Sequence, residues 1–130
     1  MIQRTSLAAA LFVVIAAFAS PAAAQSMLGT WDVPCCNGAY RFTIQVTSDD
    51  GQTFSGAMID QATGRQDSTV RGSYGGGSVT FDRSDAWGVQ HWSASLVNEG
   101  GRLRMVGGRW SGTGSGPGVS PEFSGTRMGG

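Results

Sequence analysis

Short segments that alternate between apolar and polar residues run through this chain, and they constrain its fold more than any other feature. The clearest is YRFTIQVT, residues 40–47, where every second residue from Tyr40 to Val46 is apolar. Successive side chains of a β-strand point to opposite faces, so this pattern predicts a strand with one buried face. The pair Asp50-Gly51, which follows, is a strong signal for a hairpin turn.

Seven further segments of this kind complete the pattern. They are GTWDV (29–33), TFSGAMID (53–60), STVRGSY (68–74), SVTFDR (78–83), VQHWSASLV (89–97), RLRMVGGRW (102–110) and EFSGTRM (122–128). Strands joined by such short connections pair antiparallel. The sequence therefore predicts an all-β fold, an eight-stranded antiparallel up-and-down β-barrel, because closure removes unpaired edge strands. An open β-sandwich is the alternative.

The motif Phe-Ser-Gly occurs twice within the predicted strands, at residues 54–56 and 123–125. A glycine inside a strand permits a sharp bend or allows a large ring to lie over the backbone. Both uses suit the tight curvature of a small barrel.

Residues 1–24 have the pattern of a secretory signal peptide. Arg4 precedes an apolar run, residues 7–19, which is too short to span a bilayer, and a small-residue cleavage site ends at Ala24. We therefore expect an exported protein, periplasmic or secreted, with a single barrel domain over residues 25–130. No later segment is apolar enough to cross a membrane.

The charge balance disfavours a nucleic-acid partner. All nine basic residues are arginines, and without Arg4 eight of them stand against nine acidic residues, a formal net charge of −1. Binding to nucleic-acid phosphates needs a basic surface, so we expect no such partner. The glycine-rich segment 111–120 has no lysine and no helix after it, so we predict a flexible loop and not a nucleotide-binding one.

GTW, residues 29–31, opens the first predicted strand, and Arg127 lies in the last. These residues resemble the signature of the calycins, which include lipocalins, fatty-acid-binding proteins and avidins. The resemblance implies that Trp31 packs at the closed end of the barrel with Arg127 stacked on its face. The order of GTW, DGQTFSGAMI, VRGSY, HWSASLV and GGRWSGTGSG is most similar to the avidin and streptavidin family over most of the mature chain.

The residues with which avidins hold biotin are missing here. Val33 and Asn37 fall near the positions of the asparagine and serine of the avidin first-strand region, and Met58 and Asp60 near those of the tyrosine and serine of the third. A buried ureido group without its hydrogen-bond partners is costly. The resemblance therefore implies a barrel but not a biotin site.

Five residues are candidates for ligand binding. The resemblance makes Trp92 and Trp110 aromatic walls of a cavity. Trp87 lies in a predicted loop, where it is either an exposed contact or a lid over the barrel opening. Asp60 either faces the barrel mouth or is a solvated turn residue. His91, the only histidine, is either a base or pH-sensitive ligand contact, or an ordinary hydrogen-bonded barrel residue.

Cys35 and Cys36, the only cysteines, are adjacent in the connection between the first two predicted strands. Adjacent α-carbons are about 3.8 Å apart, below the usual disulfide range of roughly 4.4–6.8 Å, so a bond between these residues requires strain. An exported compartment nevertheless favours oxidation. A vicinal disulfide, two thiols and an inter-chain bridge all stay open, whereas the spacing does not indicate a dedicated metal site.

We expect a non-enzymatic binding module, without metal or cofactor, that holds a small, partly apolar ligand between the tryptophans at the barrel mouth. The first alternative is an exported barrel that binds another protein through its loops, as an inhibitor or envelope accessory factor does. The second is a thiol-based enzyme that uses Cys35 or Cys36 with His91 as its base. A filled barrel interior favours the first alternative, and a distant His91 counts against the second.

Overall fold

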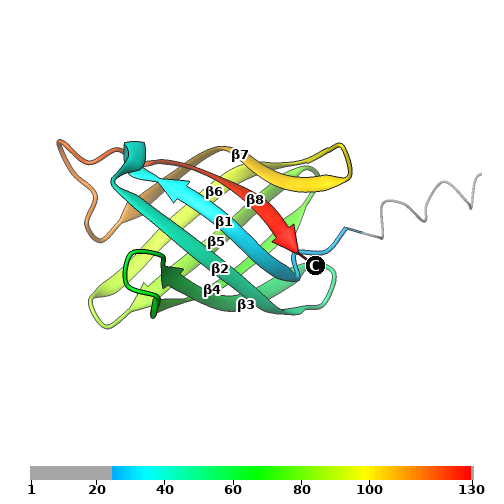
Figure 1. Ribbon diagram of the computed structural model, residues 1–130, viewed down its shortest axis with the longest axis horizontal. Coiled ribbons are helices and arrows are strands. Elements are labelled where there is room, and N and C mark those ends of the chain that lie inside the picture. The colour runs from blue at the N-terminus through cyan, green and yellow to red at the C-terminus, as the bar shows by residue number, and fades with distance from the viewer. Residues whose placement is uncertain (1–24, 130) are drawn as a thin grey trace, which may run out of the picture.

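The computed structural model describes residues 25–129 and shows a closed barrel of eight antiparallel strands (Figure 1). The strands are β1 (Gly29–Cys35), β2 (Tyr40–Asp49), β3 (Thr53–Asp60), β4 (Arg65–Gly75), β5 (Ser78–Asp85), β6 (Gly88–Glu99), β7 (Arg102–Gly112) and β8 (Glu122–Gly129). Each strand pairs with its sequence neighbours, and β1 also pairs with β8. The predicted fold class and up-and-down order are confirmed. The expected signal peptide, residues 1–24, lies outside the described residues.

The turns follow the local chemistry of the sequence, as the β2–β3 hairpin shows. Gly51 has a φ of 98°, in the left-handed region that favours glycine. The carboxylate of Asp50 accepts hydrogen bonds from the backbone N–H groups of Thr53 (2.7 Å) and Gln52 (2.9 Å) and from the Thr53 hydroxyl (2.8 Å). These bonds lower the pKa of Asp50 to about 2.

Inward-facing residues of the strands fill most of the barrel interior. Phe42, Ile44 and Val46 of β2 are all buried, as their alternation predicts. An aromatic cluster occupies the middle, where the ring of Phe123 lies 4.7 Å from that of Trp92 and 6.2 Å from that of Phe81, between ring centroids. The interior is therefore a packed core and not a continuous channel.

Both glycines of the repeated Phe-Ser-Gly motif lie at points of close approach. A Cβ atom on Gly56 would collide with the backbone carbonyl of Gln45, next to a register shift between β2 and β3. A Cβ atom on Gly125 would lie 2.6 Å from Met105 Cε and 3.5 Å from the ring of Trp31. The first glycine thus permits two strands to approach, and the second makes room for core side chains.

The segment before β1 closes one end of the barrel. Trp31 is fully buried, and its Nε1 donates to the carbonyl of Met27 at 2.9 Å. Nη1 of Arg127 donates to the carbonyl of Ser26 at 2.7 Å, and this hydrogen bond stands in place of the expected stacking on Trp31. The position of Trp31 agrees with the expected plug, and Arg127 ties the N-terminal segment to β8.

Asp49 holds the same segment from the other side. Its carboxylate accepts hydrogen bonds from the backbone N–H of Met27 (2.6 Å) and Gly51 (2.7 Å) and from the hydroxyl of Tyr74 (2.9 Å). Burial raises the pKa of Asp49, but the hydrogen bonds outweigh it and leave the pKa below its usual value. Burial and the Asp49 hydrogen bond raise the pKa of Tyr74 to about 12.

The two ends of the barrel differ in what covers them (Figure 1). The end with the N-terminal segment, called the closed end below, carries three tight hairpins and β8's last residue. The opposite end, called the mouth end, carries the 3-10 segment Cys36–Gly38 (η1), the turns 61–64 and 86–87, and the long loop 113–121. No helix within residues 25–129 has the length and apolar character needed to cross a bilayer.

Candidate functional site

The four connections of the mouth end surround a pocket of about 380 Å³, called the mouth pocket below. Its walls combine five aromatic side chains, three carboxylates, one arginine and the two cysteines. The aromatic residues are Tyr40, Phe42, Trp87, Trp92 and Trp110. The pocket thus includes all three tryptophans that the sequence analysis proposed as ligand contacts.

The three tryptophans of the pocket become more exposed from the core toward solvent. Phe81 stacks on Trp92 with 5.6 Å between ring centroids, and Trp92 stacks on Trp110 at 6.0 Å, both nearly parallel. Trp92 and Trp110 are 2% and 8% exposed, whereas Trp87 is 86% exposed. Trp87 therefore stands at the rim of the pocket and is not folded over it as a lid.

The two buried indole N–H groups differ in their partners. Nε1 of Trp92 donates to Oε1 of Gln90 at 3.2 Å. Nε1 of Trp110 is buried and has no acceptor among the residues that the structure describes. Leaving a buried donor unpaired costs roughly 1–3 kcal/mol. The nitrogen is closed to solvent, so Trp110 contributes its ring to the pocket wall.

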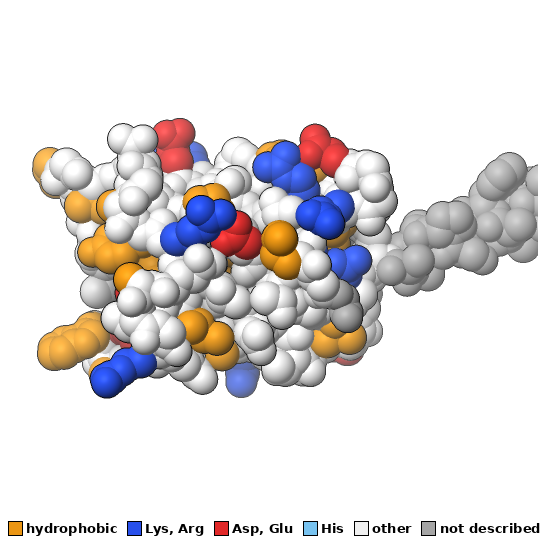
Figure 2. Space-filling model, in the orientation of Figure 1, with side chains coloured by type: hydrophobic (Ala, Val, Ile, Leu, Met, Phe, Trp, Pro, Cys, Tyr) orange, Lys and Arg blue, Asp and Glu red, His pale blue; other side chains and the backbone are white. Residues whose placement is uncertain are grey.

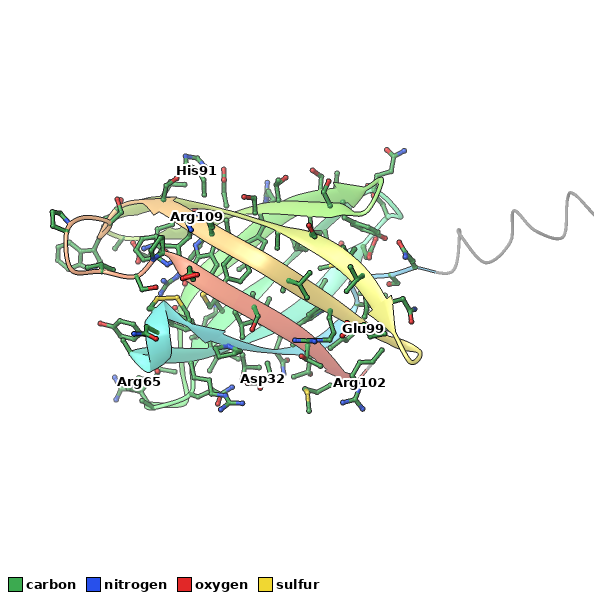
Figure 3. The ribbon with its side chains drawn as sticks, turned by 90° about the horizontal axis from the view of Figure 1, so that it is seen from above. Asp32, Arg65, His91, Glu99, Arg102 and Arg109 are labelled. Carbon is green, nitrogen blue, oxygen red and sulfur yellow. A yellow bond between two sulfur atoms is a disulfide. The ribbon has the colours of Figure 1, made fainter. Side chains whose placement is uncertain are left out.

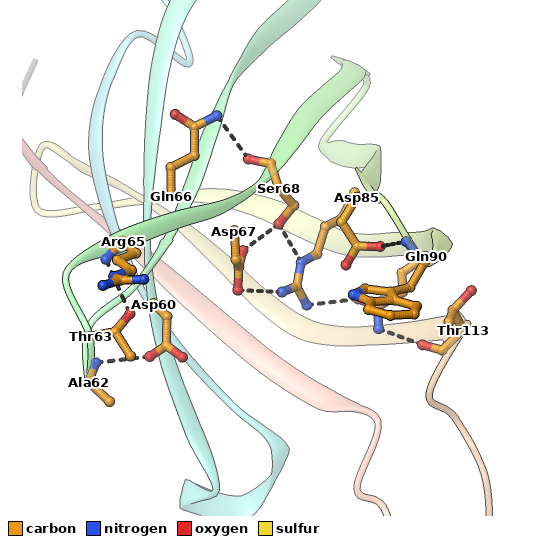
Figure 4. A network of polar contacts seen from close by, with 12 residues as sticks. Asp60, Ala62, Thr63, Arg65, Gln66, Asp67, Ser68, Asp85, Gln90 and Thr113 are labelled. Atoms are coloured by element: carbon orange, nitrogen blue, oxygen red, sulfur yellow. Dashed lines mark hydrogen bonds and ion pairs between the residues drawn. The ribbon is translucent and has the colours of Figure 1, made fainter.

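Arg83 organises the polar side of the pocket (Figure 4). Its guanidinium donates to Ser68 Oγ (2.7 Å), Asp67 Oδ2 (2.8 Å) and Gln90 Oε1 (3.0 Å). It also lies over the ring of Phe42, 4.7 Å from the centroid. The side chain is only 13% exposed, so this network holds β4, β5 and β6 in a fixed arrangement below the rim.

Gln90 connects this network to the long loop. Its Oε1 accepts from both Arg83 and Trp92, and its Nε2 donates to the carbonyl of Thr113 at 2.6 Å (Figure 4). One amide therefore fixes the buried tryptophan and the start of the 113–121 loop together. The arrangement preorganises the wall of the pocket.

The other two carboxylates of the pocket lack a cationic partner in the described part of the chain. Asp60 points into the mouth, where its Oδ1 accepts only from the backbone N–H of Ala62 at 2.9 Å. Asp85 Oδ1 accepts from the N–H groups of Trp87 (2.8 Å) and Gly88 (3.0 Å), which fixes the turn that carries Trp87. Since Asp67 offsets Arg83, the lining has a formal net charge of −2.

The cysteine pair forms part of the same wall. Cys35 and Cys36 are joined by a vicinal disulfide, one of the three states left open by the sequence, and both are buried. Cys36 and Asn37 have φ values of 67° and 58°, which non-glycine residues seldom adopt. The strained connection between β1 and β2 therefore presents a disulfide to the pocket.

His91 is not part of the mouth. It lies on the outer face of β6, 67% exposed, with Nδ1 2.6 Å from Oδ1 of Asp82 (Figure 3). It lines a second pocket, of about 650 Å³, together with Arg71 and Arg109, and this pocket shares Trp92 and Trp110 with the mouth pocket. The thiol-enzyme hypothesis needed this histidine beside a free cysteine, and the structure shows neither condition.

Sequence reasoning named Asp60 but missed the other polar residues of the pocket, and strand alternation could have found two of them. Arg83 lies two residues after the inward Phe81, and Gln90 two before the inward Trp92, so both face inward. The same rule places His91, next to Trp92, on the outside. Residues 25–129 contain no group of three or more potential ligands that could hold a metal ion.

A scan against protein-family models, a search of curated proteins and a search of solved structures each found no match to this chain. The class of protein is therefore defined by the structure itself, a closed eight-stranded antiparallel barrel with one plugged end and one open, aromatic-lined end.

Proposed function

We propose that this protein is an exported, non-enzymatic binding module that holds a small, partly apolar ligand in the mouth pocket. The observation that carries the proposal is the stacked pair of Trp92 and Trp110 in the pocket lining. The volume of about 380 Å³ falls within the size range of small-molecule sites.

The network around Arg83 supports this function. Four hydrogen bonds and one cation–π contact hold the polar wall, so little side-chain entropy is left to lose when a ligand binds. A binding site that is rigid before its ligand arrives gains affinity.

The barrel is compatible with the calycin architecture, and we propose a distant relationship to that group with a different ligand from biotin. Val33 and Met58, which fall near biotin-contact positions, are fully buried apolar side chains. They offer no hydrogen bonds to a ureido group. The packed middle of the barrel also restricts a ligand to the mouth.

A second candidate function rests on the exposed apolar side chains of the mouth end. Trp87, Tyr40, Val89 and Val119 are each more than 40% exposed there, and Figure 2 shows hydrophobic side chains gathered at this end. Such a rim suits contact with an apolar segment of another exported protein. The filled interior also favours this candidate over a deep cavity binder.

Native mass spectrometry of the protein purified from its own host separates the two candidates. A small molecule that stays bound in the native spectrum, and is released on unfolding, is the result we expect. Its loss from a Trp110→Ala variant that remains folded would place it in the mouth pocket. A protein that co-purifies in stoichiometric amount, with no small molecule, would support the second candidate and contradict the first.

A further inference from the structure

The lining of the mouth pocket carries excess negative charge, and the proposed function assigns it no role. Asp60 and Asp85 each accept hydrogen bonds only from nearby backbone N–H groups, and neither forms an ion pair within residues 25–129. Arg41, at the same end, is bound to Asp32 outside the pocket. Arg65 is the cross-strand neighbour of Asp60, but it is exposed, forms no ion pair with Asp60 and is not part of the lining. The pocket therefore favours positive charge over negative charge.

Arg83, the one cation of the lining, already serves protein partners. Each of its three guanidinium nitrogens donates to Asp67, Ser68 or Gln90, which leaves two of its five N–H groups free. Asp67 offsets its charge, and the side chain is largely buried beneath the rim. An anion in the pocket would therefore face two further carboxylates, and like charges repel.

The aromatic rings add a second attraction for cations. The faces of aromatic rings are negative, and a cation within about 6 Å of a ring centroid is attracted to them, most strongly by tryptophan. Tyr40 and Trp87 offer exposed rings beside the two free carboxylates. Arg83 over Phe42, at 4.7 Å, is an example of this contact inside the same pocket.

We propose that the mouth pocket selects small organic cations that combine an ammonium group with a flat apolar body. The ammonium group lies among Asp60, Asp85 and the rim aromatics. The flat body packs against the tryptophan rings of the lining. This inference rests on the proposed small-molecule function and deepens it.

The test compares three probes of closely similar shape by isothermal titration calorimetry. They are (3-hydroxyphenyl)trimethylammonium, its neutral isostere 3-tert-butylphenol, and the anion 3-hydroxybenzenesulfonate. We expect the cation to bind at least about tenfold more tightly than the neutral probe, and the anion to bind most weakly. Added salt should weaken cation binding and leave the neutral probe unaffected.

Two variants test whether the carboxylates of the mouth pocket cause the preference for the cation. Asp60→Asn and Asp85→Asn each keep a carbonyl oxygen for the local backbone hydrogen bonds and remove one charge. Each should weaken cation binding by about three- to tenfold and leave the neutral probe unchanged. Glu99→Gln removes the same charge at the closed end, where Glu99 binds Arg104, and serves as the matched control. Circular dichroism confirms that every variant is folded.

The outcomes distinguish the cation preference from small-molecule binding at the mouth. Equal affinity for the cation and its neutral isostere would overturn the cation preference but leave small-molecule binding at the mouth intact. No binding of any probe up to about 10 mM would count against both. Cation binding that responds equally to Glu99→Gln and Asp85→Asn would show a general charge effect and overturn the assignment to the mouth.

Discussion

At the scale of single residues, Arg83 holds the polar network of the mouth pocket together. Removing it in Arg83→Ala leaves Asp67, Ser68 and Gln90 without their shared donor, in a region that is mostly buried. We expect the free energy of unfolding to fall by about 2–4 kcal/mol in urea denaturation. Arg41→Ala is the control, because Arg41 is 60% exposed and its pair with Asp32 should contribute less than about 1 kcal/mol. Similar losses in both variants would contradict the role given to the network.

The two buried tryptophans Trp110 and Trp31 should differ in their effects on stability and on ligand binding. Trp110→Phe removes a donor that has no protein acceptor, whereas Trp31→Phe removes one that binds the carbonyl of Met27. Both variants lose similar ring volume. We expect Trp31→Phe to lower the unfolding free energy by about 1 kcal/mol more than Trp110→Phe does, and only Trp110→Phe to weaken ligand binding. Urea denaturation and calorimetry measure the two effects, and equal stability losses would be evidence against an unpaired donor.

Asp49 at the closed end predicts how stability depends on pH. Its folded-state pKa is lowered, so it stabilises the fold fully above its unfolded pKa, about 3.9, and that contribution is lost as the pH falls through the folded value. Asp49→Asn should therefore flatten the decline of stability between about pH 4 and pH 2. Urea denaturation over this range measures the change. Glu122→Gln, at an exposed position, is the control. If stability declined at low pH in Asp49→Asn as it does in the native protein, Asp49 would not be its cause.

At the scale of elements, the disulfide at η1 should constrain the local backbone more than it stabilises the whole fold. The disulfide between Cys35 and Cys36 closes almost no chain, so it restricts the unfolded state very little. It does constrain the backbone at the edge of the mouth pocket, where Cys36 and Asn37 have positive φ. Its removal should therefore affect binding more than unfolding.

We expect the double variant Cys35→Ser/Cys36→Ser to bind its ligand several-fold more weakly while its melting temperature shifts by less than about 4 °C. Scanning fluorimetry and calorimetry with the host-derived ligand measure these changes. A reductant should weaken binding by the native protein and have no effect on the double variant. A large fall in melting temperature with unchanged affinity would contradict this account.

The strands were predictable from sequence, while the site was only partly so. Alternation located all eight strands, but β4 begins at Arg65 and not at Ser68, because its pairing with β3 continues across a register shift. Trp92 and Trp110 followed from a family resemblance, and Trp87 followed from its place in a predicted loop. The network of Arg83 and Gln90 depends on the register that pairs these two residues across β5 and β6, which a single sequence does not specify. The oxidation state of the cysteines likewise depends on a three-dimensional arrangement.

At the scale of the whole molecule, the two ends of the barrel are built differently. The closed end is sealed by Trp31, Asp49 and Arg127, which tie the N-terminal segment to three different strands. The mouth end concentrates the exposed aromatics, the uncompensated carboxylates and the long loop. A packed core lies between them, so stability and binding can be altered separately.

The most direct test of this account follows the four tryptophan indole N–H signals by ¹H–¹⁵N NMR while (3-hydroxyphenyl)trimethylammonium is added. We expect the signals of Trp87, Trp92 and Trp110 to move, because all three residues line the mouth pocket. The signal of Trp31, at the closed end, should stay in place. Unchanged mouth signals at saturation, or a shift confined to Trp31, would contradict ligand binding at the mouth.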